Sequence, residues 1–248
     1  MCTLIVARNG ANRHFPLVVA TNRDESPTRP SADPDWQPGG FYAPLDLVRG
    51  GSWIGVNRHG LVAALTNRFL APRYRRRRSR GLLVTDALAA RTTAEAVAAI
   101  KAQPAGTYNG FQLFLDDGRE AALVWSDAGD FRVQRLGDGL WVFTGDDRLP
   151  GVSLRAGFVI ANIATQGWPR RSLPQFQNLL SLHDPDDAET GTCVHGPGVT
   201  METVSSMVIR RSAKKDDPIS VAWRTGRPCL GGPWHETSLR ISPPADNG

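Results

Sequence analysis

Two short runs of apolar, largely β-branched residues open the chain and predict a β-hairpin. They cover residues 2–8 and 16–22. The polar stretch between them contains Asn9 followed by Gly10, a pair that favours a tight turn between antiparallel strands. The chain therefore begins with two paired strands.

A second pair of strands is expected at 52–57 and 60–67, where two apolar runs are separated by only two residues. Residues 26–47 lie between the two pairs and are rich in Pro, Asp and Gly. This composition predicts a loop that runs over the surface.

The pattern changes after residue 80 to Ala- and Leu-rich segments that predict helices at 81–90 and 93–102. Thr92 and Glu95 have the spacing of a capping box and mark the start of the second helix. Further helices are expected at 151–166 and 172–183. Strands are expected at 111–117, 120–127, 131–137, 140–145, 203–211, 219–226 and 237–242.

This order of elements predicts an α+β fold. Blocks of antiparallel strands alternate with pairs of helices, which favours sheets in the middle and helices outside. A polar loop is expected at 184–200. Because no linker separates the blocks, residues 1–248 are interpreted as a single domain.

The formal net charge of +5 comes from one short segment, residues 73–80, which holds six arginines and no acid. Without these arginines the formal net charge would be −1. Only one aromatic residue interrupts the run, so we expect a solvated loop and not a nucleic-acid site.

The apolar runs are too short to span a membrane, and the first residues do not have the pattern of a secretory signal. We therefore expect a cytoplasmic protein. Its three cysteines, an odd and sparse number, argue against a disulfide framework.

Cys2 is the first candidate for chemistry, since removal of Met1 would make it the N-terminal residue. Its own α-amine, with an ordinary pKa of about 7.7–8.0, would then be able to accept the thiol proton. The alternative is a small, buried first residue of a strand.

Asn22, Arg23, Asp24 and Glu25 form a polar cluster where the second strand is expected to leave the sheet. Asp24 would accept a hydrogen bond from an ammonium group, and Arg23 would lower a thiol pKa or bind a substrate carboxylate. A structural turn in which Asn22 and Asp24 cap backbone amides is an equal alternative.

These motifs resemble the NRDE family, whose eukaryotic members are called transport and Golgi organization protein 2. The resemblance rests on Cys2, on "NRDE" at 22–25 and on "GGSWIGVNRHGLVAALTN" at 50–67. It extends to "SRGLLV", "YNGFQLFLDD" and "TVSSMVI" further along the chain.

That family in turn resembles the N-terminal-nucleophile hydrolases, which include choloylglycine hydrolases, penicillin V acylase and acyltransferases. The resemblance implies a four-layer αββα sandwich with two antiparallel sheets. It also implies that Cys2 is the nucleophile, that Asp24 orients its amine and that Arg23 belongs to the site. Asn67 resembles the asparagine near the oxyanion site of these enzymes.

Further residues are expected at the site. Asn109 would supply a further amide, and Asn22 and Trp53 are expected to contact the substrate. A second arginine late in the hydrolase chains has two candidate counterparts here, Arg210 and Arg224, and no motif selects between them.

Cys193, His195, Cys229 and His235 offer two thiols and two imidazoles, the ligand types of a tetrahedral zinc site. Their spacing fits no common zinc pattern, so incidental loop residues are the favoured interpretation and no metal site is expected.

Two functions remain open. The first is a cysteine hydrolase or acyltransferase that acts on a non-peptide amide or a thioester through Cys2. The second is a non-catalytic protein that uses the same cleft to hold haem or an acyl ligand. Both imply a small-molecule partner. No cofactor is expected beyond haem as a ligand in the second case, and the oligomeric state is left open.

Overall fold

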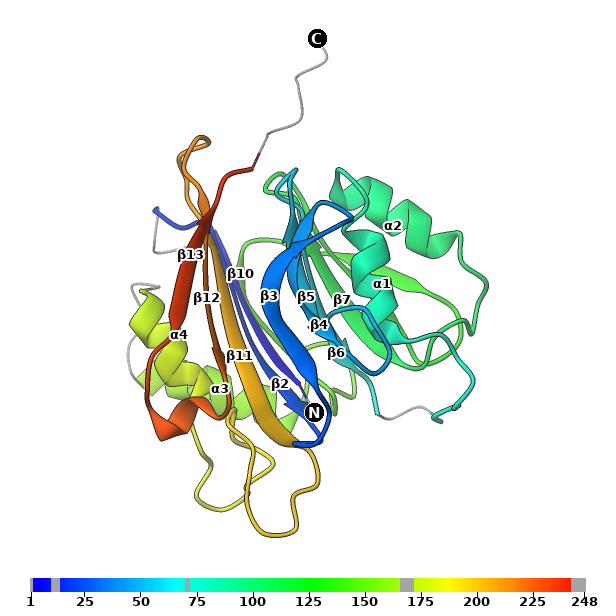
Figure 1. The fold of residues 1–248 in the computed structure, drawn as a ribbon. Helices are drawn as coiled ribbons and strands as arrows, with labels where there is room; N and C mark the ends of the chain where they lie inside the picture. Colours follow the sequence, from blue (N-terminus) through cyan, green and yellow to red (C-terminus); the bar gives the residue numbers. More distant parts are fainter. Residues whose placement is uncertain (1, 10–13, 70–71, 166–171, 242–248) are drawn as a thin grey trace. The chain divides into compact units, whose positions relative to one another are not determined.

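The computed structural model describes residues 2–9, 14–69, 72–165 and 172–241. The chain divides into two compact units (Figure 1). Unit 1 consists of Met1–Thr28 and Asp138–Leu239, and unit 2 consists of Arg29–Gly137 and Arg240–Gly248. Unit 1 is thus assembled from two stretches that are far apart in the sequence.

Unit 1 contains a six-stranded antiparallel sheet in the order β10-β1-β2-β11-β12-β13. The first hairpin of the sequence forms the adjacent strands β1 and β2 of this sheet, with Thr3 opposite Asn22. Its elements are β1 (Thr3–Arg8), β2 (Leu17–Glu25), β10 (Gly139–Thr144), α3 (Leu154–Thr165), α4 (Leu173–Leu180), β11 (Glu202–Arg211), β12 (Ile219–Thr225), the 3₁₀ helix η1 (Pro228–Leu230) and β13 (His235–Leu239).

Helices α3 and α4 cover one face of this sheet, α3 against β10 and α4 against β2 and β11. Their apolar side chains pack on alternate residues of the strands. The core includes Ile5, Val18, Ala20, Val159 and Phe176. Side chains on the other face of β1 and β2 are buried as well, which explains why these strands have continuous apolar runs and no alternation.

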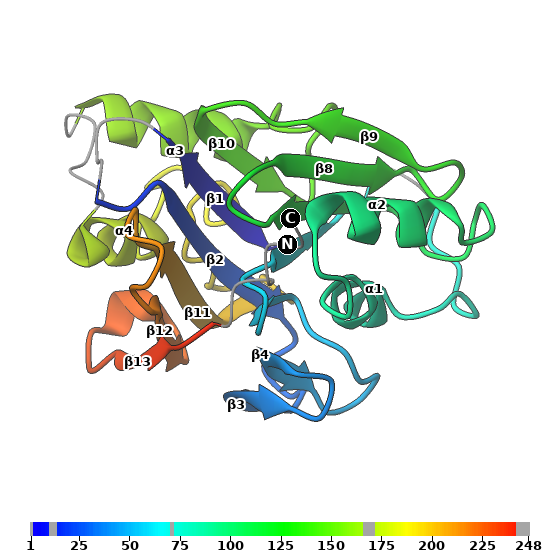
Figure 2. The same ribbon diagram turned by 90° about the horizontal axis from the view of Figure 1, so that it is seen from above.

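Unit 2 contains a seven-stranded antiparallel sheet in simple sequence order, from β3 to β9. Helices α1 and α2 lie on it, α1 against β5 and β6 and α2 against β7 and β8 (Figure 2). The elements are β3 (Ser31–Gln37), β4 (Phe41–Asp46), β5 (Ile54–Asn57), β6 (Val62–Asn67), α1 (Arg80–Ala87), α2 (Thr93–Lys101), β7 (Phe111–Asp116), β8 (Ala121–Ser126) and β9 (Arg132–Arg135).

Two of the sequence motifs that resemble the NRDE family pack on each other within unit 2. The backbone N–H of Ser52 donates to the Gly81 carbonyl at 3.0 Å. A Cβ on Gly51 would lie 2.2 Å from the carbonyl carbon of Gly81, and Gly51 has a positive φ of 79°. These glycines are therefore required by the close approach of α1 to the segment before β5.

The predicted capping signal of α2 is confirmed. Thr92 is the N-cap and its hydroxyl accepts from the Glu95 backbone N–H at 3.1 Å. The Glu95 carboxylate reaches back to the Arg91 backbone N–H at 2.8 Å, one residue before the cap. Two N–H groups at the helix start are thereby satisfied.

The prediction of a loop at 26–47 is wrong, because β3 and β4 occupy most of that range. Pro34 lies within β3, which is an edge strand, and the pairing with β4 shifts register between Ala32 and Asp35. An edge strand with a bulge tolerates the missing N–H of proline. The Pro- and Gly-rich composition therefore indicated an edge hairpin and not a loop.

The second strand is longer than predicted. It does not end at residue 22 but continues through Glu25, because β11 pairs with it as far as Glu202. The segment 184–200 contains no helix or strand, as predicted. The Asn9-Gly10 turn and the last residue of the helix predicted at 151–166 lie outside the described residues. The helix predicted at 172–183 is confirmed as the shorter α4 (Leu173–Leu180).

The arginine run is only partly solvated, so that prediction needs correction. Arg77 donates to the carbonyls of Tyr108 and Ala128 at 2.8 and 2.6 Å. Arg78 pairs with Asp86, and Arg80 donates to Gly110. These three arginines join the segment to the start of β7 and to α1, and only the first half of the run is freely exposed.

Candidate functional site

Cys2 immediately precedes β1 and lies beside the "NRDE" segment of β2. Its side chain is buried, at 7% exposure. The backbone N–H of Asp24 donates to its sulfur. Burial is the main cause of a raised pKa for the Cys2 thiol, and the Asp24 carboxylate adds to it, whereas the Asp24 N–H and the Arg23 guanidinium lower it.

Strand alternation separates the side chains of the "NRDE" segment. Asn22 and Asp24 both bond to groups on the helix-covered face of the sheet. Arg23 stands between them in an extended strand and so projects from the opposite face. It is buried there. Arg23 and Asp24 are therefore neighbours in sequence but have different surroundings.

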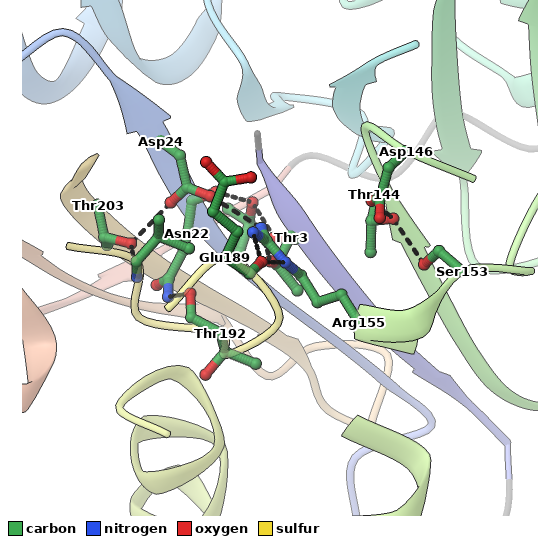
Figure 3. A network of polar contacts seen from close by, with 12 residues as sticks. Thr3, Asn22, Asp24, Thr144, Asp146, Ser153, Arg155, Glu189, Thr192 and Thr203 are labelled. Atoms are coloured by element: carbon green, nitrogen blue, oxygen red, sulfur yellow. Dashed lines mark hydrogen bonds and ion pairs between the residues drawn. The ribbon is translucent and has the colours of Figure 1, made fainter. Parts of the chain in front are cut away.

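The Asp24 carboxylate is held by two side chains from distant parts of unit 1 (Figure 3). Arg155 Nη1 of α3 lies 2.9 Å from Asp24 Oδ2, and Thr203 Oγ1 of β11 lies 2.7 Å from Oδ1. The same Arg155 nitrogen is 3.1 Å from Thr3 Oγ1. Arg155 Nε donates to the Glu189 carbonyl at 3.0 Å. This buried ion pair fixes the carboxylate next to the start of β1.

Asn22 joins β2 to two other segments. Its Nδ2 donates to the carbonyls of Leu180 and Thr192 at 2.8 and 2.7 Å, and its Oδ1 accepts from Ser206 Oγ at 2.6 Å. Both amide hydrogens are thus used within the protein. These contacts give Asn22 a structural role at the end of α4 and in the loop that follows.

A second polar group lies at the end of β10, where Thr144 pairs with Thr3. Thr144 Oγ1 is 2.6 Å from a carboxylate oxygen of Asp146 and of Asp147, and 2.8 Å from Ser153 Oγ. Because Ser153 directly precedes α3, this group fixes the start of the helix that carries Arg155.

The sequence analysis missed Arg155 and Thr203. The two candidates for a second arginine lie elsewhere in unit 1. Arg210 donates to Ser220 Oγ, and Arg224 of β12 lies opposite Ser206 of β11 in the sheet. A signal for Arg155 exists in the sequence, since it lies on the buried face of α3 together with Ala156, Val159 and Ile163. A charged residue in such a stripe needs a buried partner.

The other predicted site residues belong to unit 2. Asn67 ends β6 opposite Phe111, and the buried Trp53 accepts the Leu65 N–H at its carbonyl. Asn109 exchanges two hydrogen bonds with the backbone of Tyr74, at 2.7 and 2.9 Å. Their roles toward Cys2 stay predictions from the resemblance.

The histidines and cysteines that cluster in the structure differ by one residue from those proposed from the sequence. His183, Cys193, His195 and Cys229 come together in unit 1. His235 instead stacks on Trp223, with ring centroids 5.4 Å apart. His183 was not among the sequence candidates for a zinc site.

Comparison with known proteins agrees with the motifs. Residues 1–166 match the model of the family described as Transport and Golgi organisation 2. The human Transport and Golgi organization protein 2 homolog is 35% identical over 111 residues, which cover 42% of this chain and 39% of the human protein. The cattle homolog is 35% identical over 109 residues, with the same coverage. The match therefore spans about two fifths of these relatives.

Solved structures extend the likeness to the whole fold. A Caenorhabditis elegans N-acylethanolamine-hydrolyzing acid amidase ortholog superposes with a TM-score of 0.60 and 16% identity, over 84% of this chain and 92% of that chain. A mutant of the conjugated bile acid hydrolase from Clostridium perfringens gives a TM-score of 0.54 and 9% identity, over 96% and 92%. At these identities the likeness shows the fold alone, the predicted α+β sandwich of the N-terminal-nucleophile hydrolases. Among the described residues, no helix has the length and apolar character needed to cross a membrane.

Proposed function

The chain belongs to the Transport and Golgi organisation 2 family, and on this premise we propose that it is a cysteine N-terminal-nucleophile enzyme. Its reaction is hydrolysis or acyl transfer on a non-peptide amide or a thioester, with Cys2 as the nucleophile. The single observation that carries the proposal is the contact between Cys2 and the Asp24 N–H, at the head of the first strand of this fold. The two fold relatives described above are named as hydrolases, one of an N-acylethanolamine and one of conjugated bile acids.

The proposed chemistry begins with removal of Met1, which leaves a thiol and a free amine on the same residue. The amine takes the thiol proton while the sulfur attacks the substrate carbonyl. The tetrahedral intermediate collapses as the ammonium returns the proton to the leaving group. Water, or a second nucleophile in acyl transfer, then releases the acyl group from the Cys2 thioester.

The polar contacts of unit 1 have definite roles in this scheme. The Asp24 N–H stabilises the thiolate, and the Arg23 guanidinium also favours it. The Asp24 carboxylate is the charge that would orient the new ammonium. Arg155 and Thr203 hold that carboxylate in place and act as positioning residues.

Residues of unit 2 enter this proposal only through the family resemblance. Asn67 is proposed as a donor to the oxyanion, and Trp53 and Asn109 as substrate contacts. Asn22 of unit 1 is proposed as a further substrate contact, and its amide hydrogens already bond to the Leu180 and Thr192 carbonyls.

The test combines intact mass with activity. The purified protein is expected to lack Met1 and to form an acyl adduct on Cys2 when incubated with N-acylethanolamines, N-acylglycines or acyl-CoA thioesters. Cys2→Ala is expected to lose at least about 10³-fold in rate with an unchanged melting temperature. Ser238→Ala, at an exposed position of β13 in the same sheet, serves as the control. Full activity of Cys2→Ala would contradict the proposal.

One observation favours the second function, a carrier without catalysis. The Cys2 thiol is buried and its pKa is raised, the reverse of the usual environment of an activated cysteine. The carrier predicts saturable binding of haem or of an acyl ligand that is the same in the wild type and in Cys2→Ala. Calorimetric titration of both proteins distinguishes it from the enzyme, since the enzyme predicts turnover that depends on Cys2.

A further inference from the structure

Two histidines and two cysteines form a cluster in unit 1 that the proposed reaction does not use. They are His183, Cys193, His195 and Cys229, and one ligand atom from each lies within 4.8 Å of all the others. His195 Nε2 is 3.3 Å from Cys229 Sγ, and the rings of His183 and His195 meet edge to face with centroids 4.8 Å apart.

The four side chains come from two separate segments. His183, Cys193 and His195 belong to the loop between α4 and β11, and Cys229 belongs to η1 after β12. Cys193 is fully buried, whereas His183 is exposed. The cluster therefore has a closed inner side and an outer side through which an ion can enter.

The donor set fits one kind of ion best. Two thiolates and two imidazoles are the ligands of a tetrahedral zinc site, and with a divalent ion the charge of the group sums to zero. A zinc site with standard bond lengths has ligand–ligand distances of about 3.3–3.8 Å. The His195–Cys229 distance already falls in this range, and the remaining atoms need to move inward by about 1 Å at most.

The backbone of the loop is fixed where its ligands sit. The Cys193 N–H donates to the Leu182 carbonyl at 2.9 Å. Val194 exchanges hydrogen bonds with Thr203: its N–H donates to Thr203 Oγ1 at 2.9 Å, and its carbonyl accepts the Thr203 N–H at 2.8 Å. Cys193 and His195 therefore flank a residue that is tied to β11, which limits the entropy lost when they bind an ion.

We propose that His183, Cys193, His195 and Cys229 bind one Zn²⁺ ion, which clamps the loop after α4 to η1. The proposal replaces His235 of the sequence analysis by His183. It is independent of the reaction at Cys2.

The clamp has a structural consequence for the network around Asp24. The same loop contributes the Thr192 carbonyl that accepts from Asn22 and the Glu189 carbonyl that accepts from Arg155. A loop of this length without secondary structure is uncommon in a compact domain and is usually functional or disordered, so a bound ion that joins it to η1 would restrict its conformations. Zinc would therefore stabilise the segment on which the positions of Asn22 and Arg155 depend.

The test is metal analysis of the whole chain, purified under reducing conditions without chelator. The wild type is expected to contain one zinc ion per chain, measured by inductively coupled plasma mass spectrometry. Exchange for Co²⁺ is expected to give the charge-transfer absorption of a thiolate-bound ion. His183→Ala is expected to bind at least about 10-fold more weakly, and because His183 is exposed this variant is expected to fold.

Two matched variants make the result specific. Cys229→Ala is expected to lose both the zinc and the Co²⁺ absorption, while His235→Ala keeps both. Cys2→Ala is also expected to keep the zinc, which separates this test from that of the proposed function.

Three results would overturn the zinc proposal. The first is reduced wild-type protein that neither contains zinc nor takes up Co²⁺. The second is equal metal content in the wild type and Cys229→Ala. The third is a Cys193–Cys229 disulfide in the reduced preparation, detected by peptide mass mapping.

Discussion

At the scale of single residues, the environment of Asp24 decides what the "NRDE" segment can do. Its carboxylate is buried and paired with Arg155, and Thr203 donates to its other oxygen. A buried carboxylate needs such partners because desolvation of an unpaired charge is very unfavourable. The Asp24–Arg155 ion pair is thus central to the polar network at this end of the unit 1 sheet.

Arg155→Met is expected to lower the free energy of unfolding by about 3–5 kcal/mol, since it leaves Asp24 buried without its cation. Urea unfolding followed by fluorescence measures the change. Arg91→Met, at an exposed position, is the control and is expected to stay within about 0.5 kcal/mol of the wild type. The double variant Arg155→Met with Asp24→Asn should recover part of the loss, and a further loss would contradict the pairing argument.

The Cys2 thiol gives a prediction about pH. Its pKa lies above the ordinary value of 9.0, mainly because the side chain is buried. The neutral thiol is therefore favoured in the folded state, and the stability that this contributes is lost as pH rises through the raised pKa. The rate of Cys2 alkylation by iodoacetamide should accordingly reach half its maximum above pH 9.0.

Arg23 variants provide the matched comparison for this titration. Since the guanidinium lowers the Cys2 pKa, Arg23→Met is expected to move the midpoint to higher pH, and Arg23→Lys to move it less. Peptide mass mapping assigns the label to Cys2. A midpoint below pH 9.0 in the wild type would show that burial does not dominate.

At the scale of elements, the close approach of two backbone segments explains the glycines of the "GGSWIG" and "SRGLLV" motifs better than a catalytic role does. Gly51 and Gly81 meet where α1 begins beside the segment before β5. By contrast, Gly157 lies on the exposed side of α3, and a Cβ there would meet no described atom within 4 Å. The two positions therefore predict opposite effects of the same substitution.

Gly51→Ala is expected to destabilise the protein by about 2–5 kcal/mol, because the new methyl group overlaps the Gly81 backbone and the residue keeps a positive φ. Gly157→Ala is expected to stabilise it by about 1 kcal/mol, the difference between Gly and Ala in a helix. Thermal unfolding of both variants measures the contrast. Equal effects of the two substitutions would contradict the packing of α1 at Gly51.

At the scale of the whole molecule, the charge is local and divided between two roles. Arg73, Arg75 and Arg76 are exposed, whereas Arg77 donates to two carbonyls of unit 2. The run therefore carries both the surplus charge and part of the packing of unit 2. A uniform description as a basic patch does not fit it.

The triple variant Arg73→Ser, Arg75→Ser, Arg76→Ser lowers the formal net charge from +5 to +2. It is expected to elute earlier from a cation exchanger and to keep its melting temperature, because exposed charges contribute little to stability. Arg77→Met, which removes only one charge, is expected to destabilise by about 1.5–3 kcal/mol. A large stability loss in the triple variant would argue that these side chains are also structural.

The sequence by itself determined the kinds of element and most of their places. Apolar runs, turn residues and the Thr92 cap are local signals, because their physical causes act within a few residues. For the same reason the length of β2 was underestimated, since its last residues are strand only through pairing with β11. The Pro-rich edge hairpin of β3 and β4 was missed because an edge strand tolerates residues that a central strand excludes.

The tertiary structure alone decided which side chains meet. Cys2, Asp24 and the "NRDE" motif were visible in the sequence, but Arg155 is 131 residues from Asp24 and Thr203 is 179 residues away. The same holds for His183 and Cys229, which come from different connections of unit 1. Such contacts depend on the complete sheet and its helices, and no local pattern encodes the partner of a buried charge or a metal ligand.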